Sequence, residues 1–312
     1  MAQQIVDEST AAHRFIEEIN DSLDPVRFEP LQVRQLMPTF GARISGVDLS
    51  AELDSQTRAL LRDAWLTYGV VIFTDQRKLT SDQHLEVAKI FGTPDTGSPF
   101  VEKLTRNVDV ITTDASRPPV TNLWHSDNTA LANPSLGTLI QIQECPRIGG
   151  NTSWASATKA YRCLSAAMRR CIDGLSAVHY WDTRGRKQAH YLSTGLDLER
   201  YTEQVADHPP RSWPVVRVHP VTGAKAIYVN ETYTTYIEGL HAYESRAILE
   251  FLYSWIRLPE FYATHSWAPN DIAVWDNFQV QHYGIADYSE FRVNQRVTFT
   301  DFVATGRQAV SA

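Results

Sequence analysis

Two short stretches of this chain carry side chains that together could bind a metal ion. The first is Trp124-His125-Ser126-Asp127, and the second, far downstream, is Gln281-His282-Tyr283. If His125 and Asp127 lie on a strand, their side chains point to the same face, because side chains alternate along a strand with period two. With His282 they would form a 2-His-1-carboxylate facial triad, which holds ferrous iron on one face and leaves the opposite positions open. This ligand set is typical of oxygenases.

A pair of arginines follows the second histidine. Arg292 and Arg296 stand four residues apart on a predicted strand and therefore on the same strand face. The chain as a whole is acidic, with a formal net charge of −7. Two cations on one strand face of an acidic protein indicate a local binding site for an anion, and the planar fork of a guanidinium suits a carboxylate well.

Length, composition and charge indicate what kind of protein carries these residues. With 312 residues, 43% of them hydrophobic, the chain can bury a sizeable core. The acidic balance provides no basic surface for nucleic acid or an anionic membrane, so we expect neither as a partner. The sequence contains no apolar run of the roughly 18 residues that span a bilayer and no signal-like start. The three cysteines are an odd number without metal-like spacing, which fits a reducing, cytoplasmic location.

The N-terminal part of the chain is organised differently from the rest. Residues 1–30 are polar and poorly periodic, and we interpret them as an N-terminal extension. A single domain is expected to fill residues 31–312. Its first half begins with a helix over residues 54–68 and a buried strand over residues 70–73. A capping box at Thr80 then opens a second helix that ends near residue 92.

From about residue 108 onward the pattern is dominated by short strands. Strands are predicted at residues 136–142, 215–218, 226–229, 271–275 and 292–302, and helices at residues 155–175 and 241–256. This order favours a mainly β fold with flanking helices, a jelly roll, in which facing sheets bring distant residues to one mouth. Such a fold would let His282 meet His125 and Asp127. Residues 180–213 form a long, lid-like insertion, for which two interpretations stay open: a lid over the site or an ordinary surface excursion.

Several motifs resemble those of the taurine dioxygenase and 2,4-dichlorophenoxyacetate dioxygenase family of iron(II)- and 2-oxoglutarate-dependent oxygenases. The resemblance extends over roughly residues 31–302 and implies a cupin-like double-stranded β-helix with helices packed outside. The matching stretches are Gly46-Val47-Asp48-Leu49, Trp124-His125-Ser126-Asp127, Gly149-Gly150-Asn151-Thr152-Ser153-Trp154, His219-Pro220-Val221-Thr222-Gly223, Val229-Asn230-Glu231, Pro269-Asn270-Asp271-Ile272-Ala273-Val274-Trp275-Asp276-Asn277 and Gln281-His282-Tyr283.

The resemblance also implies roles for individual residues. His125, Asp127 and His282 match the iron ligands of the family. Thr152 and Arg292 match the threonine and the arginine that hold the distal carboxylate of 2-oxoglutarate. Arg296 matches an arginine that meets the substrate's sulfonate in taurine dioxygenase and lies near the cofactor in related enzymes, and both roles stay open. The implied cofactors are Fe(II), 2-oxoglutarate as co-substrate, and O2.

Departures from taurine dioxygenase concern the substrate. Gly97 and Phe100 stand where that enzyme has a histidine and a tyrosine, Thr121 replaces an asparagine, and Arg184 aligns near a small serine. Together with Tyr233 these residues predict a larger and more aromatic substrate pocket. We therefore expect a small anionic substrate bulkier than taurine. The resemblance further implies a homodimer or homotetramer.

The predicted reaction oxidises a C–H bond of the substrate, normally to an alcohol, and releases succinate and CO2. Desaturation, epimerisation and cyclisation are alternative outcomes within the same chemistry. Two other classes are also open. A zinc-dependent hydrolase could use the same three ligands, although it would have no use for a carboxylate cradle at Thr152 and Arg292. A non-catalytic jelly-roll binding module could retain the scaffold without chemistry.

Overall fold

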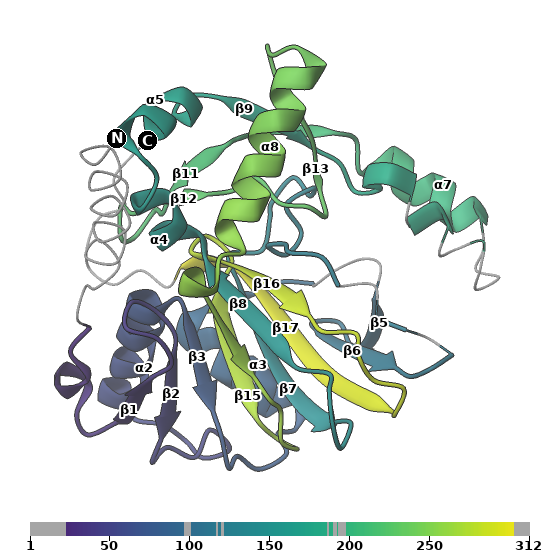
Figure 1. Cartoon of the computed structure of the whole chain (residues 1–312). Coiled ribbons are helices and arrows are strands. Elements are labelled where there is room, and N and C mark those ends of the chain that lie inside the picture. Colours follow the sequence, from purple (N-terminus) through teal and green to yellow (C-terminus); the bar gives the residue numbers. More distant parts are fainter. Residues whose placement is uncertain are drawn as a thin grey trace.

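A computed structural model of the chain shows a large β-sheet with smaller sheets and helices stacked on it (Figure 1). The structure describes residues 23–96, 101–116, 118–119, 122–185, 187–189, 192 and 198–302. The large sheet has nine strands. In spatial order eight of them are β1 (Gln32–Gln35), β2 (Ala42–Ser45), β3 (Val70–Phe73), β15 (Ile272–Asp276), β7 (Gly137–Glu144), β17 (Arg292–Phe302), β6 (Val108–Thr113) and β5 (Glu102–Thr105), and β4 (Gly92–Pro94) pairs with β17.

Three smaller sheets accompany the large one. They are β14 (Tyr262–His265), β8 (Thr152–Ser156) and β16 (Val280–Gly284); β10 (Arg211–Pro214), β9 (Ser176–His179) and β13 (Thr234–Ile237); and β11 (Val216–Val218) with β12 (Lys225–Ile227). Strands distant in sequence lie side by side in both main sheets: β15 pairs with β3 and β7, and β16 pairs with β8. This is the jelly-roll arrangement that the strand pattern predicts.

Helices cover the sheets and connect them. They are η1 (Pro25–Phe28), α2 (Ser55–Tyr68), α3 (Ser81–Phe91), α4 (Ala157–Arg162), α5 (Ala166–Ile172), η2 (Thr183–Gly185), α7 (Leu198–Asp207), α8 (Ala242–Ile256) and η3 (Pro259–Phe261). Local signals set their ends. The Asp54 carboxylate accepts from the Thr57 amide at 2.7 Å to start α2, and Gly69, at φ +71°, ends it in the left-handed region. The predicted capping box of Thr80 and Gln83 opens α3.

The two faces of the large sheet bury two different cores. On β3, Val71 and Phe73 pack into the outer core beneath α2 and α3. Val70 and Ile72 point the other way and pack in an inner core that includes Trp154 of β8. Because side chains alternate along β3, this one strand contributes to both cores. The β14–β8–β16 sheet lies on the inner face of the large sheet. Residues on that inner face are the ones that can build a site between the sheets.

One predicted helix is wrong. The helical pattern over residues 155–175 is divided, because the strand β8 extends to Ser156 and two helices follow. Ser156 caps α4 by accepting from the Lys159 amide, and Ser165 caps α5 by accepting from the Met168 amide. A serine side chain that accepts a backbone N–H starts a helix instead of continuing one. The helical periodicity is therefore present in the structure, but it extends over two helices, α4 and α5.

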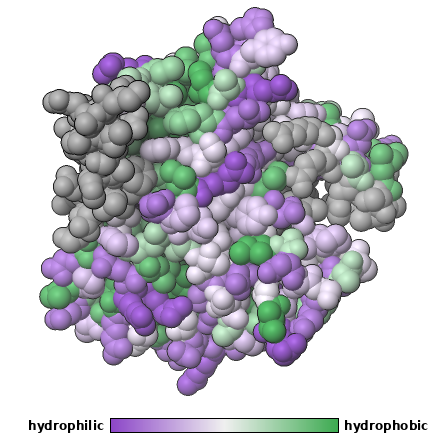
Figure 2. Space-filling view, in the orientation of Figure 1, coloured by the Kyte–Doolittle hydropathy of each residue, from purple (hydrophilic) through white to green (hydrophobic). Residues whose placement is uncertain are grey.

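The insertion over residues 180–213 contains regular structure. Its described part includes η2, α7 and β10, and α7 projects from the upper sheets in Figure 1. At the other end of the domain, Phe28 is fully buried in the outer core, so packing begins before residue 31. The division into an extension and one domain stays a prediction, and residues 1–22 lie outside the described residues. The visible face of the molecule mixes hydrophilic residues with small hydrophobic patches (Figure 2).

Candidate metal centre

A backbone bridge brings the two histidines together. The His125 amide donates to the His282 carbonyl at 3.0 Å, and the His282 amide donates to the His125 carbonyl at 2.7 Å. His282 lies on β16, whereas His125 forms only this isolated bridge. The expectation that His125 and Asp127 share a regular strand is therefore wrong. Asp127 lies in the turn that follows, where its amide donates to Asn277 Oδ1 at 3.1 Å.

Three ligand atoms nevertheless converge. His125 Nε2 lies 3.9 Å and His282 Nε2 lies 3.7 Å from Asp127 Oδ1, and the two imidazole centroids are 4.1 Å apart. All three side chains are buried, and their ligand atoms lie within 4.8 Å of one another. The geometry thus collects two nitrogens and one carboxylate oxygen around one point.

The protonation states suit metal binding. His125 Nδ1 lies 2.7 Å from the Leu123 carbonyl, which can only accept, so Nδ1 carries the proton and Nε2 keeps its lone pair. Burial lowers the pKa of His125, and burial together with His125 lowers the pKa of His282 to about 3. Burial opposes ionisation of Asp127, but His282, Arg296 and His125 together with the Thr138 hydroxyl lower its pKa to about 2. At neutral pH the site offers two neutral imidazoles and one carboxylate.

Such a donor set fits ferrous iron. Both histidine Nε2 atoms lie less than 4 Å from Asp127 Oδ1, and all three ligand atoms lie within 4.8 Å of one another, so a cation placed among them can bind two imidazoles and a carboxylate at once. Two imidazoles and a carboxylate on one face are the donors that non-haem iron(II) sites use. The residues present therefore fit the group that the sequence predicts.

A second layer of hydrogen bonds holds the aspartate. The Thr138 hydroxyl donates to Asp127 Oδ2 at 2.7 Å, which leaves Oδ1 turned toward the histidines. Asn277 Nδ2 donates to Thr138 Oγ1 at 3.1 Å, and Trp275 Nε1 donates to Asn277 Oδ1 at 3.1 Å. Thr138 was not predicted from the sequence, because a threonine on a strand carries no distinguishing signal. Asn277 lies within the Trp275-Asp276-Asn277 motif, which could have pointed to it.

Both strand arginines face the interior between the sheets. Val297 and Phe299 of β17 pack in the outer core, so the alternate positions of Arg292 and Arg296 point to the inner face. Arg296 donates from Nε and Nη2 to Asp109 Oδ2 at 3.0 and 2.6 Å. Its Nη1 lies 3.8 Å from Asp127 Oδ1. Asp109, 1% exposed, is a partner that no sequence pattern predicts.

Thr152 and Arg292 occupy facing strands of the two sheets. Thr152 shares its strand face with Trp154 of the inner core, and its hydroxyl accepts from Trp267 Nε1 at 3.0 Å. Arg292 is buried, and its Nε has no hydrogen-bond partner among the described residues. Burial raises the pKa of the Cys145 thiol, and the positive charge of Arg292 opposes that rise. The same thiol lies 3.6 Å from the Trp267 carbonyl oxygen. Leaving a buried guanidinium N–H without a hydrogen bond costs free energy, so an acceptor such as a carboxylate would be bound favourably here.

The residues predicted to contact substrate are only partly described. The Tyr233 ring lies 6.5 Å from the His125 ring between centroids. Burial and the nearby Asp127 charge raise the pKa of Tyr233 above its ordinary value, so that it stays a neutral phenol. Phe100 and Thr121 lie outside the described residues. The backbone of Arg184 belongs to η2, but its side chain also lies outside the described part.

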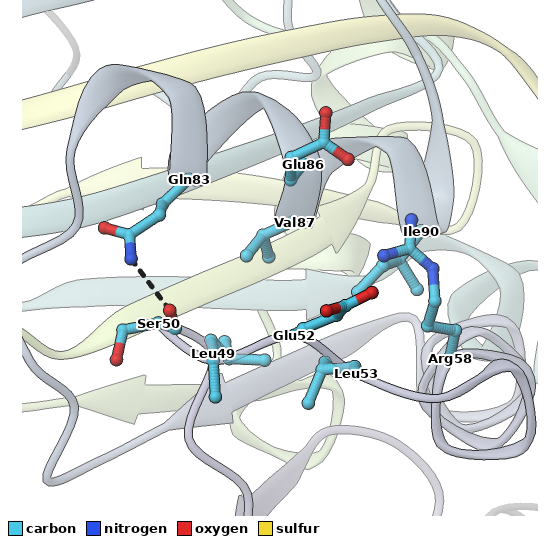
Figure 3. Close-up of a pocket in the computed structure, with 10 residues that line it drawn as sticks. Leu49, Ser50, Glu52, Leu53, Arg58, Gln83, Glu86, Val87 and Ile90 are labelled. Atoms are coloured by element: carbon cyan, nitrogen blue, oxygen red, sulfur yellow. Dashed lines mark hydrogen bonds between the residues drawn. The ribbon is translucent and has the colours of Figure 1, made fainter.

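A groove between α2 and α3 is separate from this centre. Figure 3 shows its apolar floor, which includes Leu53 and Val87, and its rim, where Glu86 and Arg58 stand. Gln83 Nε2 donates across it to the Ser50 carbonyl at 2.7 Å. The groove borders the outer core, whereas the metal ligands lie on the inner side of the large sheet. We therefore assign the chemistry to the inner site.

Comparisons with known proteins agree with the geometry. The model of the family described as "Taurine catabolism dioxygenase TauD, TfdA family" matches residues 32–298. An alkylsulfatase of Acinetobacter baylyi is 32% identical over 89% of this chain and 87% of its own length. An alpha-ketoglutarate-dependent sulfate ester dioxygenase of Pseudomonas putida is 29% identical over 88% of this chain and 91% of its own. The crystal structure of a taurine dioxygenase from Burkholderia xenovorans superposes with a TM-score of 0.73 at 32% identity, covering 90% of this chain and 95% of that one.

None of the helices in the described residues has the length and apolar character needed to cross a membrane.

Proposed function

Since the chain belongs to the taurine catabolism dioxygenase TauD, TfdA family, we propose that His125, Asp127 and His282 hold its iron and that Thr152 and Arg292 hold its co-substrate. The protein is a non-haem iron(II)- and 2-oxoglutarate-dependent dioxygenase with a cupin-like jelly-roll fold. Its cofactors are Fe(II), 2-oxoglutarate and O2. The zinc hydrolase and the non-catalytic module are set aside by this membership.

One observation carries the assignment of the site residues. The three ligand atoms converge within 4.8 Å in a buried place, and an arginine with a buried, unmatched Nε points into the space between the same two sheets. A dication would bind the three ligand atoms, and a carboxylate would accept a hydrogen bond from the arginine Nε. A structural cluster without a ligand would leave both unsatisfied.

Bound iron supplies the activation of O2 that no amino-acid side chain can provide. Overall, one oxygen atom enters a C–H bond of the substrate and the other enters succinate, while the C1 carboxylate of 2-oxoglutarate leaves as CO2. The protein's own share is positioning. Thr138 fixes the Asp127 carboxylate through Oδ2, and Leu123 fixes the tautomer of His125. Arg292 and Thr152 are proposed to orient the distal carboxylate.

Arg296 is proposed to act on the cofactor side. Asp109 holds two of its nitrogens, and the remaining Nη1 lies 3.8 Å from Asp127 Oδ1, an atom of the metal-ligand set. An anion that accepts from Nη1 would lie close to the proposed iron ligands, so Nη1 would help to hold a co-substrate that binds beside them. Of the two roles that the family resemblance left open, we therefore propose the one on the cofactor side.

The substrate is proposed to be an organic sulfate ester or sulfonate larger than taurine. Both curated relatives described above act, by name, on sulfate esters, and anionic substrates suit the family. Hydroxylation of the carbon that bears the sulfate oxygen gives an unstable product. Its C–O bond to sulfate breaks as the new hydroxyl loses its proton, so that an aldehyde and hydrogen sulfate are released. The enzyme is further proposed to be cytoplasmic, to form a homodimer or homotetramer, and to fold as one domain.

A substrate screen tests this function. Alkyl sulfates, sulfonates, aryloxyalkanoates and amino acids are supplied with iron(II), 2-oxoglutarate and O2, and succinate is measured above the level formed without substrate. We expect the largest increase with a sulfate ester or sulfonate and little with taurine. Replacement of His125, Asp127 or His282 by alanine should abolish the increase. The largest increase with a neutral compound would refute the substrate assignment.

A further inference from the structure

Three charged side chains lie in a row across the neighbouring strands β5, β6 and β17 (Figure 1). Lys103 stands opposite Asp109 in the register of β5 and β6, and Asp109 stands opposite Arg296 in the register of β6 and β17. Cross-strand partners point to the same face of a sheet. Val108, the neighbour of Asp109, packs in the outer core, so the three charges lie on the inner face, the side of the metal ligands.

The carboxylate of Asp109 is divided between the two cations. Its Oδ2 accepts from Arg296 Nε and Nη2 at 3.0 and 2.6 Å, and its Oδ1 accepts from the ammonium of Lys103. Asp109 is buried, whereas the side chain of Lys103 is 30% exposed on β5, the last strand of the sheet. One buried carboxylate thus links an accessible lysine to an arginine of the interior.

The row of charges continues to an iron ligand. Arg296 Nη1 lies 3.8 Å from Asp127 Oδ1. Burial would lower the pKa of Arg296, but Asp109 and Asp127 raise it, so this arginine stays a cation. The four groups therefore alternate in sign, from Lys103 through Asp109 and Arg296 to Asp127, and their formal charges cancel. Without Lys103 the two aspartates outnumber the arginine.

A second acceptor fixes the position of the Lys103 ammonium. It donates to the Thr96 carbonyl at 2.5 Å, in the segment that follows β4. That segment is itself attached to the sheet, because the Asp95 amide donates to the Thr298 carbonyl of β17 at 3.0 Å. Asn107 Nδ2 donates to the Asp95 carbonyl at 2.6 Å. A lysine side chain held by two acceptors keeps its charge in one place.

We propose that Lys103 is a positioning residue of the co-substrate site: it binds Asp109 Oδ1 and so preserves the charge with which Arg296 attracts 2-oxoglutarate. The inference rests on the proposed function, in which Arg296 acts on the cofactor side. A carboxylate shared by two cations neutralises each of them only in part, so Arg296 keeps positive charge toward the metal centre. Without Lys103, Asp109 becomes the counter-ion of Arg296 alone. The site then has one more negative charge, which repels the dianion 2-oxoglutarate and attracts a metal cation.

Two anaerobic binding equilibria of Lys103→Met test the proposal, because the loss of a positive charge acts on them in opposite directions. Iron(II) affinity is measured by competition with a chelator in the absence of 2-oxoglutarate. The dissociation constant of 2-oxoglutarate is then measured at saturating iron(II) from the visible charge-transfer absorption. For Lys103→Met we expect 2-oxoglutarate to bind about fivefold more weakly, or ~1 kcal/mol. Iron(II) should bind at least as tightly as it does to wild type.

Three further variants accompany this measurement. Lys103→Gln can still donate a hydrogen bond but has no charge, and it should behave like Lys103→Met. Lys103→Arg keeps the cation and should bind 2-oxoglutarate within about twofold of wild type. Lys225→Met is the matched control, because it removes a lysine of β12 that pairs with Asp173 at 2.8 Å, and it should change neither constant. Unchanged 2-oxoglutarate binding in Lys103→Met, weaker binding of both ligands, or an equal loss in Lys103→Arg would overturn the proposal.

Arg296→Gln, measured in the same way, separates this inference from the proposed function. If Arg296→Gln weakens 2-oxoglutarate binding and Lys103→Met does not, only the role of Lys103 is wrong. If Arg296→Gln leaves 2-oxoglutarate binding unchanged, the cofactor-side role of Arg296 is wrong, and the role of Lys103 is wrong with it. A wild-type protein without the charge-transfer absorption would refute the site assignment on which both roles depend.

Discussion

Replacement of Thr138 by valine removes one hydroxyl and almost nothing else. That hydroxyl donates to Asp127 Oδ2 at 2.7 Å and accepts from Asn277 Nδ2 at 3.1 Å. Valine has nearly the same shape, so the buried strand can keep its packing. The variant therefore isolates the contribution of the second hydrogen-bond layer to the metal site.

The expected effect has two parts. A hydrogen bond to a charged group contributes roughly 1.5–3 kcal/mol, and Asn277 loses an acceptor as well, so the free energy of unfolding of the metal-free protein should fall by about 2 kcal/mol. Without the Thr138 hydroxyl the Asp127 carboxylate can turn toward Arg296 Nη1, 3.8 Å away. Loss of such a partner typically weakens metal binding about 10- to 100-fold. We expect iron affinity to fall within that range.

Anaerobic competition between the protein and an iron(II) chelator measures the affinity, and chemical denaturation measures the stability. Thr138→Ser keeps the hydroxyl and should retain most of the iron affinity. Thr39→Val is a matched control, because Thr39 is buried and its hydroxyl has no partner among the described residues. If folded Thr138→Val binds iron as tightly as wild type, the reasoning about Asp127 is refuted.

Further variants test the remaining parts of the site and of the fold. Arg292→Ala should raise the apparent KM for 2-oxoglutarate about tenfold or more in steady-state assays, since a charge-assisted contact to the distal carboxylate is lost; an unchanged KM would remove this arginine from the cofactor site. Arg296→Gln should raise the KM for 2-oxoglutarate more than that for the organic substrate, and the reverse order would move it to the substrate side. Asp109→Asn leaves a buried guanidinium without its charged partner, so unfolding by denaturant should show a loss of about 3 kcal/mol; a loss below 1 kcal/mol would contradict the pairing. Burial lowers the pKa of His179 to about 3, below the value of about 6.5 in an unfolded chain. The unfolded state therefore takes up more protons between these values, and stability present above pH 6.5 is lost as the pH falls. His179→Gln should lose less stability than wild type between pH 7 and pH 5 in thermal melts, whereas an equal loss would exclude the histidine as a cause.

Local and periodic features of the fold could be predicted from the sequence. The helix ending at Gly69, the capping box at Thr80 and the strand of residues 292–302 depend on neighbours in the chain, and the structure has all three. The two arginines share a strand face for the same reason. The division at Ser156 and Ser165 was missed, because helical periodicity continues through a serine that can equally serve as a cap.

The site was harder to derive, because its contacts join distant segments. The sequence indicated the ligand types, yet it placed His125 and Asp127 on a strand. In the structure a bridge to His282 and a turn held by Asn277 bring them together. Thr138 lies eleven residues beyond the aspartate, and no sequence pattern links the two. Such partners follow from sheet register, which is a property of the whole fold.

The most direct test of the iron site is a single spectroscopic titration. Iron(II) is added anaerobically to the protein in the presence of 2-oxoglutarate, and the visible spectrum is recorded. We predict a metal-to-ligand charge-transfer band that saturates at one iron per chain and is missing in Asp127→Ala and His282→Ala. A wild-type protein that remains colourless at saturating iron and 2-oxoglutarate, or an Asp127→Ala variant with an undiminished band, would contradict the assignment of these ligands.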